Sequence, residues 1–506
     1  MEIEDETLRA GRGRDPGPPD VEAERNSDAA FARRFSLLWL TIVSGLMLSH
    51  EMWRDEFQAW LIARDSRSVG ELISNLRYEG SPSLWPLLVF LLARMTSWPG
   101  AMQFLHLVVA ATTVCLLVSY GPFGRRLNVA LSFGYFFLYE YAVISRNYAL
   151  EVLGVILFCI AYHRAGRHRL LWASGALAVI ALTSAYGVIV AAALLAAITV
   201  DMVRAGGPSR RQAALAGIVV AAAIGFAALS LRQPADAAFR IVPSLTWNDS
   251  RFAEAFADVW RGFIPLPVLR TDFWNSNIFE PLPMLAVVGG LLVPPLCAWT
   301  LRRSPGALTG FAVGSGGLFL FSYFVFSGGV RHHGHYFVLF VAACWMAAVS
   351  VPPRSFRPWR HVLMALAAIH LAAAGYAAVM EAALPFSGSR AAAAYIANTW
   401  PDDVPIVVDP ELPGTAFAAL SRRQVYFAQS DRWGSFVIWN TRQQLSGPER
   451  AVAAADRLSA TLGKDVLLIL AYDASLPSRF RRVGRFEGKL VRNETFQIYV
   501  LEHGAH

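Results

Sequence analysis

The chain has 506 residues, of which 55% are hydrophobic and 16% charged, and its mean hydropathy is +0.40. This balance excludes a soluble globular protein, because the apolar runs repeat at about the 20-residue length that crosses a bilayer. The formal net charge of +8 does not indicate a nucleic-acid partner, since the arginines stand in short clusters between the apolar runs. The four cysteines lie inside apolar runs and predict no disulfide framework.

The chain order predicts a tail followed by a polytopic α-helical membrane domain. Residues 1–30, rich in Gly, Pro, Asp, Glu and Arg, are expected to form a disordered cytoplasmic tail without a cleavable signal. Residues 31–381 are expected to form the transmembrane domain. Its spans are predicted near 35–50, 101–120, 127–144, 148–163, 170–185, 188–203, 212–231, 282–301, 307–327, 336–351 and 361–380. The apolar segment 84–98 is short and contains Pro86 and Arg94, so we interpret it as a juxtamembrane or re-entrant helix.

The arginine clusters assign the two faces of the membrane. With Arg33 and Arg34 in the cytoplasm, the arginine-rich connections all fall on the cytoplasmic side when 84–98 does not cross. These connections are 125–126, 163–169, 204–211, 302–303 and 354–360. The positive-inside rule therefore favours about eleven crossings, with large outer loops at 51–100 and 232–281.

The composition changes after about residue 382. Short apolar strands there alternate with amphipathic helices, which predicts an α/β domain over residues 382–506. An odd number of crossings places this domain outside the cytoplasm. It shows no nucleotide-binding glycine loop and no metal-ligand spacing, so we interpret it as a support or acceptor-docking module.

The segment after the first span carries the most unusual residues. Residues 52–64 repeat large aromatics at helical spacing, which predicts a helix lying on the bilayer surface with Arg54, Asp55 and Gln58 facing water. Placing acidic side chains beside hydrocarbon costs free energy, so Asp55 and Glu56 are expected to have a charged partner or a function. Further polar side chains gather at the same outer face. They are Glu79, Glu140, Arg146, Tyr148, Tyr186 and the run Arg331-His332-His333-Gly334-His335.

This combination of residue types suits chemistry on a lipid phosphate. A guanidinium group forms two charge-assisted hydrogen bonds to phosphate oxygens, and a nearby carboxylate can accept a proton or hold a divalent cation. The middle of the spans is almost free of ionisable residues, which argues against an ion-coupled carrier. The pattern therefore predicts glycosyl transfer from a polyprenyl-phosphate donor to a hydroxyl group outside the cytoplasm.

Four motifs resemble those of the GT-C membrane glycosyltransferases, the class that includes polyprenyl-phosphate-mannose protein mannosyltransferases and aminoarabinose transferases. They are Trp53-Arg54-Asp55-Glu56, Glu79-Gly80-Ser81-Pro82-Ser83-Leu84-Trp85, Ser145-Arg146-Asn147-Tyr148-Ala149-Leu150 and the arginine-histidine run before the span at 336–351. Ser81 and Ser83 replace the family's usual His and second Pro. Ile144 stands where the family's corner carries a second acid, for which Glu140 is the candidate substitute.

The resemblance implies a role for each candidate residue. Asp55 would be the catalytic base or a metal-binding acid, with Glu56 as its auxiliary, in an inverting displacement. The residues expected to bind the donor phosphate are Arg146, Arg331, His332 and His335. Those expected to contact substrate are Glu79, Glu140, Tyr148 and Tyr186. A divalent cation, Mg or Mn, is a candidate cofactor. Its candidate ligands are Asp55, His332, His333 and His335.

The composition, rich in arginine and alanine and poor in lysine, indicates a GC-rich bacterial genome and hence a multi-pass protein of the plasma (inner) membrane. The expected partners are membrane lipids, a polyprenyl-phosphate-linked sugar and an extracytoplasmic acceptor, which is a cell-envelope glycan, a lipid or a protein. Two alternatives stay open, namely a non-catalytic envelope assembly partner and a lipid transporter with a GT-C-like fold.

Overall fold

The structure is a computed structural model that describes residues 19–163, 168–238, 246–352, 357–444 and 447–504. Helix α1 begins at Pro19, so residues 19–30 of the predicted disordered tail are helical, while residues 1–18 lie outside the described part of the chain. Eight helices in the described ranges are long and apolar enough to cross a membrane. They are α1 (Pro19–Ser49), α5 (Gly100–Tyr120), α9 (Ala185–Arg204), α10 (Arg210–Ser230), α12 (Pro283–Leu301), α13 (Pro305–Phe324), α14 (Val330–Ser350) and α15 (Pro358–Ala383).

The other three predicted spans are shorter or divided. Helices α7 (Tyr148–His163) and α8 (Arg169–Ala181) are apolar but have 16 and 13 residues. The predicted span 127–144 is split into α6 (Arg125–Ser132) and a π-helix, η1 (Phe136–Glu140). Gly134 lies at the break, where an added Cβ would stand 3.2 Å from the Cβ of His370 on α15. The close approach of α15, together with the wider π turn, explains why no single straight helix forms.

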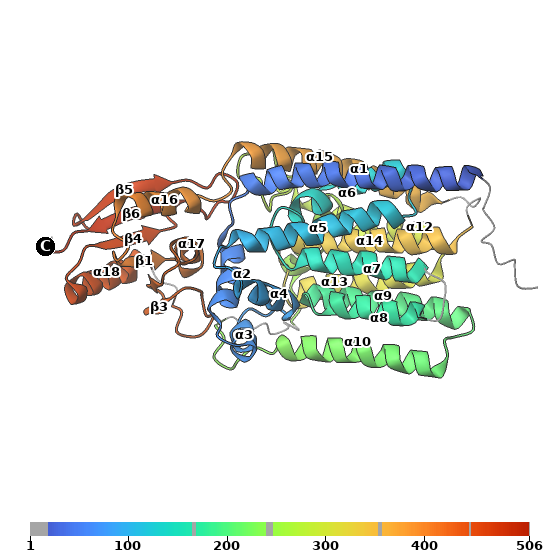
Figure 1. The fold of residues 1–506 in the computed structure, drawn as a ribbon, viewed down its shortest axis with the longest axis horizontal. Helices are drawn as coiled ribbons and strands as arrows, with labels where there is room; N and C mark the ends of the chain where they lie inside the picture. The colour runs from blue at the N-terminus through green and yellow to red at the C-terminus, as the bar shows by residue number, and fades with distance from the viewer. Residues whose placement is uncertain (1–18, 164–167, 239–245, 353–356, 445–446, 505–506) are drawn as a thin grey trace, which may run out of the picture.

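The helices lie side by side, with the start of α1 at one end of the bundle and the C-terminal domain at the other (Figure 1). We call these the arginine end and the domain end. Arg125, the first residue of α6, pairs with Asp28 of α1 at 2.7 Å. Gly306 at the start of α13 donates its backbone N–H to Asp201 near the end of α9. These contacts bring connections that carry arginines to one end of the bundle, the arrangement that the charge pattern predicts.

Helix α14 is the central helix of the bundle. In the most apolar 18-residue stretch of α14, 83% of the residues are buried inside the protein. In the corresponding stretch of the peripheral helix α10, 28% are buried. The first turn of α14 carries the arginine-histidine run at the domain end. Helix α11 (Asp249–Phe263), within the predicted outer loop 232–281, packs against this turn so closely that an added Cβ at Gly262 would stand 2.3 Å from the backbone oxygen of His333. The start of α14 is therefore held on all sides by protein.

The first outer loop forms three short helices, α2 (Arg54–Asp65), α3 (Val69–Leu76) and α4 (Leu84–Ala93). Ten residues of α-helix span about 15 Å, so α4 is too short to cross a bilayer, as expected for 84–98. Helix α2 differs from its prediction as a helix on the bilayer surface. Its aromatics Phe57 and Trp60 are buried in one hydrophobic cluster with Phe417 of the C-terminal domain. The apolar face of α2 is thus covered by protein.

The C-terminal domain is the predicted α/β unit. Its elements are α16 (Ser389–Thr399), β1 (Ile406–Asp409), α17 (Glu411–Ser421), β2 (Val425–Phe427), β3 (Arg432–Gly434), α18 (Pro448–Leu462), β4 (Val466–Leu470), β5 (Phe480–Phe486) and β6 (Phe496–Leu501). The sheet order is β3-β2-β1-β4-β6-β5, with β1 parallel to β2 and β4 and the other pairs antiparallel. Alternate residues of β1 face opposite sides, so Ile406 and Val408 pack with α17 and α2 while Val407 packs with α18.

Candidate active site at the domain end of the bundle

A cavity of about 1370 Å³ lies where the bundle, the first outer loop and the C-terminal domain meet. Its walls contain seven of the residues predicted from the sequence as catalytic, phosphate-binding or substrate-contact candidates. These are Asp55, Glu79, Arg146, Tyr148, Tyr186, Arg331 and His332. Apolar ends of membrane helices also line it, through Leu231 after α10 and Phe321 on α13, and the C-terminal domain contributes Leu412 and Trp439. The cavity therefore has both polar and apolar walls.

Asp55 joins the two predicted phosphate-binding arginines. Its Oδ2 lies 3.3 Å from Arg146 Nη1 and 3.2 Å from Arg331 Nη2, and Arg146 also donates to the backbone oxygen of Asp55 at 2.9 Å. The guanidinium of Arg331 lies over the rings of Trp53 and Trp274, at 5.3 and 5.7 Å from their centroids. Asp55 stands in the first turn of α2, where the helix dipole favours a negative charge. Two guanidinium groups facing one carboxylate leave the pocket with an excess of positive charge.

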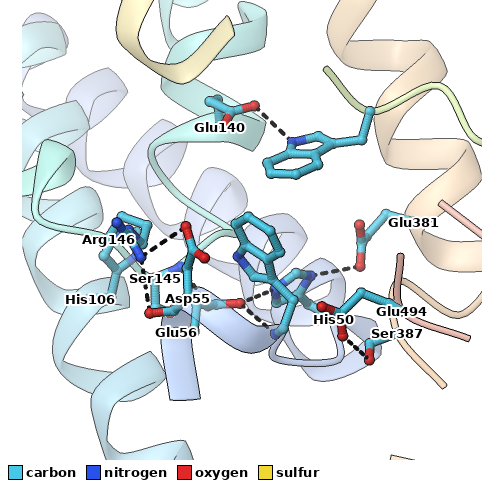
Figure 2. Close-up of polar contacts among 12 residues, drawn as sticks. His50, Asp55, Glu56, His106, Glu140, Ser145, Arg146, Glu381, Ser387 and Glu494 are labelled. Atoms are coloured by element: carbon cyan, nitrogen blue, oxygen red, sulfur yellow. Dashed lines mark hydrogen bonds and ion pairs between the residues drawn. The ribbon is translucent and has the colours of Figure 1, made fainter. Parts of the chain in front are cut away.

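Glu56, the predicted auxiliary of Asp55, does not line the cavity. It is fully buried, and its two oxygens accept hydrogen bonds from the backbone N–H of Trp53 at 3.1 Å and of Ser145 at 2.7 Å (Figure 2). The first bond closes the N-terminal turn of α2, and the second anchors the residue before Arg146. Glu56 thus sets the positions of both Asp55 and Arg146 through the backbone, in place of the auxiliary catalytic contact that the motif implied.

His50 connects Glu56 to the last membrane helix. Its Nε2 lies 2.9 Å from Glu56 and its Nδ1 lies 2.9 Å from Glu381 of α15, with all three side chains fully buried (Figure 2). Burial by itself lowers the pKa of His50, but the two carboxylates outweigh it and raise the pKa to about 10. The imidazolium in turn is the main factor that offsets burial and lowers the pKa of Glu56. A charged His50 therefore ties α1, α2 and α15 together beneath the cavity.

Glu79 is a half-buried carboxylate in the cavity wall with neutral hydrogen-bond partners. Its Oε1 accepts hydrogen bonds from Gln58 Nε2 at 2.8 Å and Trp439 Nε1 at 3.1 Å. Burial raises the pKa of Glu79 to about 7, although these two hydrogen bonds and the nearby charge of Arg146 lower it. No local signal in the sequence could have paired Trp439 with Glu79, because 360 residues separate them.

The three histidines of the run after Arg331 have three different polar partners. His332 lies in the cavity wall and its Nε2 is 2.8 Å from the hydroxyl of Tyr148. His333 turns to Asp258 of α11 at 3.2 Å, and His335 turns to Glu151 of α7 at 3.0 Å. His332 and His335, three residues apart, lie on one face of α14 and both rings pack on Tyr148 and Tyr186, whereas His333 points to another side of the helix. Because each histidine has a different polar partner, the structure does not bring the predicted ligands together. Across the described residues, no three His, Cys, Asp or Glu side chains gather as a metal site.

The remaining substrate-contact candidates divide into two groups. Tyr186 lines the cavity, and its ring stacks on His332 and His335 with centroids 5.0 and 5.1 Å apart. Glu140 lies outside the cavity wall, buried on η1, and accepts a hydrogen bond from Tyr135 at 3.0 Å. It accepts a second one from the indole of Trp274 at 3.2 Å (Figure 2). Glu140 therefore holds the aromatic residue over which Arg331 lies and makes no direct contact with the cavity.

The comparisons with known proteins bear on the fold. No protein-family model and no curated protein sequence matches the chain. Among solved structures, it is similar to ArnT from Cupriavidus metallidurans bound to undecaprenyl phosphate, with a TM-score of 0.50 and 12% sequence identity. The match covers 94% of this chain and 98% of that chain, so it includes both the bundle and the C-terminal domain. The chain has the fold of the GT-C membrane glycosyltransferases, as its motifs predicted.

Proposed function

We propose that the protein is an integral-membrane glycosyltransferase that moves a sugar from a polyprenyl-phosphate donor to an acceptor hydroxyl group. The N-terminus and the arginine end face the cytoplasm, and the cavity and the C-terminal domain lie outside it, because arginines are retained on the cytoplasmic side. The acceptor is a glycan, lipid or protein of the cell envelope. The undecaprenyl phosphate named with ArnT supports a donor of the same chemical class.

The observation that carries this proposal is the meeting of Arg146 and Arg331 on one oxygen of Asp55 inside the cavity. A pocket with excess positive charge beside apolar helix ends suits an anionic headgroup on a hydrocarbon chain. The phosphate would take the free donor positions of the two guanidinium groups, and the chain would lie along the apolar ends of α10 and α13.

The reaction that fits is a single displacement. The acceptor oxygen attacks the anomeric carbon, the bond from that carbon to the phosphate oxygen breaks, and the polyprenyl phosphate leaves with the electron pair. The two arginines neutralise the charge that develops on the leaving phosphate. A carboxylate of the cavity takes the proton of the acceptor hydroxyl group, and attack opposite to the leaving group inverts the anomeric centre.

The candidate metal ligands do not fit a divalent cation as a set. His333 and His335 are bound to Asp258 and Glu151, away from the cavity, and the carboxylate of Asp55 faces two guanidinium groups. We therefore assign no step of the transfer to a metal, and the proposal uses only side chains of this chain.

The test is binding and transfer by the Arg331→Gln variant, with Arg302→Gln at the arginine end as the matched control. Losing hydrogen bonds to a charged group should weaken polyprenyl-phosphate binding by about 10- to 100-fold. Arg302 carries the same charge at the other end of the bundle, so its variant should bind and transfer like the wild type. A wild-type protein that binds polyprenol as tightly as polyprenyl phosphate would contradict the proposal.

A further inference from the structure

We propose that Glu79, and not Asp55, is the carboxylate that takes the proton from the acceptor, and that Asp55 orients the two arginines. This inference deepens the proposed function and rests on it. It reassigns the base that the Asp55-Glu56 motif implied, and it makes the C-terminal domain part of the catalytic pocket.

The two carboxylates differ first in their partners. Asp55 directs one oxygen at Arg146 and Arg331, at 3.3 and 3.2 Å. This oxygen is already engaged in two ion pairs, so it is not open to the hydroxyl group of an acceptor. Glu79 lies in the same cavity wall, but its hydrogen bonds come from an amide and an indole, which are neutral. When two carboxylates share a site, such a contrast in surroundings separates their roles.

The charged groups around Glu79 suit proton transfer near neutral pH. Burial is the largest influence and raises its pKa to about 7, with the negative charge of Asp55 acting in the same direction. The hydrogen bond from Gln58 and the positive charge of Arg146 act in the opposite direction. A base works best when its proton affinity matches the pH at which it operates, so that it is both ionised and basic.

Glu79 is also held in a fixed position. Both of its hydrogen bonds go to Oε1, and neither uses Oε2. Gln58 is fixed in turn by the C-terminal domain, since it accepts from the backbone N–H of Val437 at 2.9 Å and donates to its oxygen at 2.8 Å. Trp439 belongs to the same segment, and its backbone oxygen accepts from the N–H of Ala238 at 2.9 Å. Segment 435–441 thus clamps the residue that we assign as the base.

In the proposed step, the acceptor hydroxyl oxygen forms the new bond to the anomeric carbon while its proton passes to Glu79. The bond between the anomeric carbon and the phosphate oxygen breaks, and its electron pair leaves with the polyprenyl phosphate between Arg146 and Arg331. The protonated Glu79 returns its proton to water after the product leaves, so the atoms and charges balance over one turnover.

The experiment compares Glu79→Gln with Asp55→Asn in steady-state transfer from polyprenyl-phosphate-sugar, over a range of donor concentrations and pH. We expect Glu79→Gln to lower kcat by about 100-fold or more with little change in the donor KM. It should also remove the loss of wild-type kcat/KM that is expected as the pH falls below about 7. Asp55→Asn should raise the donor KM, and its kcat/KM should still fall below about pH 7 as in the wild type. Equal binding of polyprenyl phosphate by Glu79→Gln and the wild type shows that the variant is folded.

Chemical rescue separates the two carboxylates directly. Formate should restore turnover to Glu79→Ala and not to Asp55→Ala, because only the first lacks a proton acceptor. Trp439→Phe should move the loss of activity to higher pH, since it removes a hydrogen bond that favours the ionised carboxylate. Glu71→Gln, a carboxylate on α3 in the same loop, is the matched control and should behave as the wild type.

The outcomes distinguish this inference from the proposed function. Near-normal kcat in Glu79→Gln, or rescue of Asp55→Ala and not of Glu79→Ala by formate, overturns the assignment of Glu79 while the transferase remains. A wild-type protein that transfers no sugar from any polyprenyl-phosphate donor overturns the proposed function, and this inference with it.

Discussion

The two ends of the bundle carry the same kinds of charged residue in opposite environments. At the arginine end, the pair of Arg125 and Asp28 leaves its side chains 49% and 64% exposed. At the domain end, His50, Glu56 and Glu381 are fully buried. Burying charges costs several kcal/mol for each ion unless each is paired, so a protein accumulates them only where their positions matter. The comparison indicates that the charges at one end set the topology and those at the other build the pocket.

Contacts at both ends join segments that are remote in the chain, since Arg125 and Asp28 are 97 residues apart and Glu56 and Ser145 are 89 apart. The two ends differ in what can replace a lost contact. The exposed pairs of charges at the arginine end have water as an alternative partner. Loss of a buried contact therefore changes the pocket, whereas loss of an exposed one changes little.

The largest expected effect comes from Glu56→Ala. It leaves the N–H groups of Trp53 and Ser145 without their acceptor and removes one of the two carboxylates that pair with His50. Breaking such a buried pair costs about 3–5 kcal/mol, so the variant should unfold at a clearly lower temperature in detergent and bind polyprenyl phosphate poorly. Glu56→Gln, which keeps one acceptor oxygen, should be less affected. Wild-type stability in Glu56→Ala would show that the buried network does not support the pocket.

A pH series gives the next largest effect. His50 has its pKa raised from 6.5 to about 10, so its contribution to stability is complete below 6.5 and is lost as the pH rises through 10. Between pH 7.5 and 10 the wild-type melting temperature should fall, with a slope of at most about 1.4 kcal/mol per pH unit from this group. Burial raises the pKa of Glu79, and that of the buried Glu494 between β5 and β6, to about 7, so both groups lie below this window. His50→Gln should flatten the curve, and an unchanged slope would assign the effect to other groups.

The charged residues of the site could be predicted from the sequence, but only part of their arrangement could. Asp55, Arg146 and Arg331 meet as predicted, because each stands where a helix begins or a turn ends at the same face of the bundle. The histidines after Arg331 were predicted as a ligand set, but the spacing on one helix does not show which acids of other helices pair with them. His333 lies against the buried Asp258 of α11, and His335 lies against the buried Glu151 of α7.

The boundary between domains was harder to predict. The amphipathic pattern of α2 was correct, but hydrophobicity alone does not say whether lipid or protein covers Phe57 and Trp60. The burial of these residues against Phe417 depends on tertiary packing across the whole chain. Trp439 was missed for the same reason, and the break at Gly134 was missed because it depends on the approach of α15. Long-range contacts leave no periodic signal in a single sequence.

The smallest expected effect comes from a change at the arginine end of the bundle. Arg125→Ala removes the exposed pair with Asp28 and should change stability by no more than about 0.5 kcal/mol, because water and salt already screen these charges. The melting temperature in detergent should stay within error of the wild type, and sugar transfer should be unchanged, since neither Arg125 nor Asp28 lines the cavity. A loss above about 1 kcal/mol would mean that the start of α6 supports the fold. The arginine end would then share the structural role that we reserve for the buried network around His50.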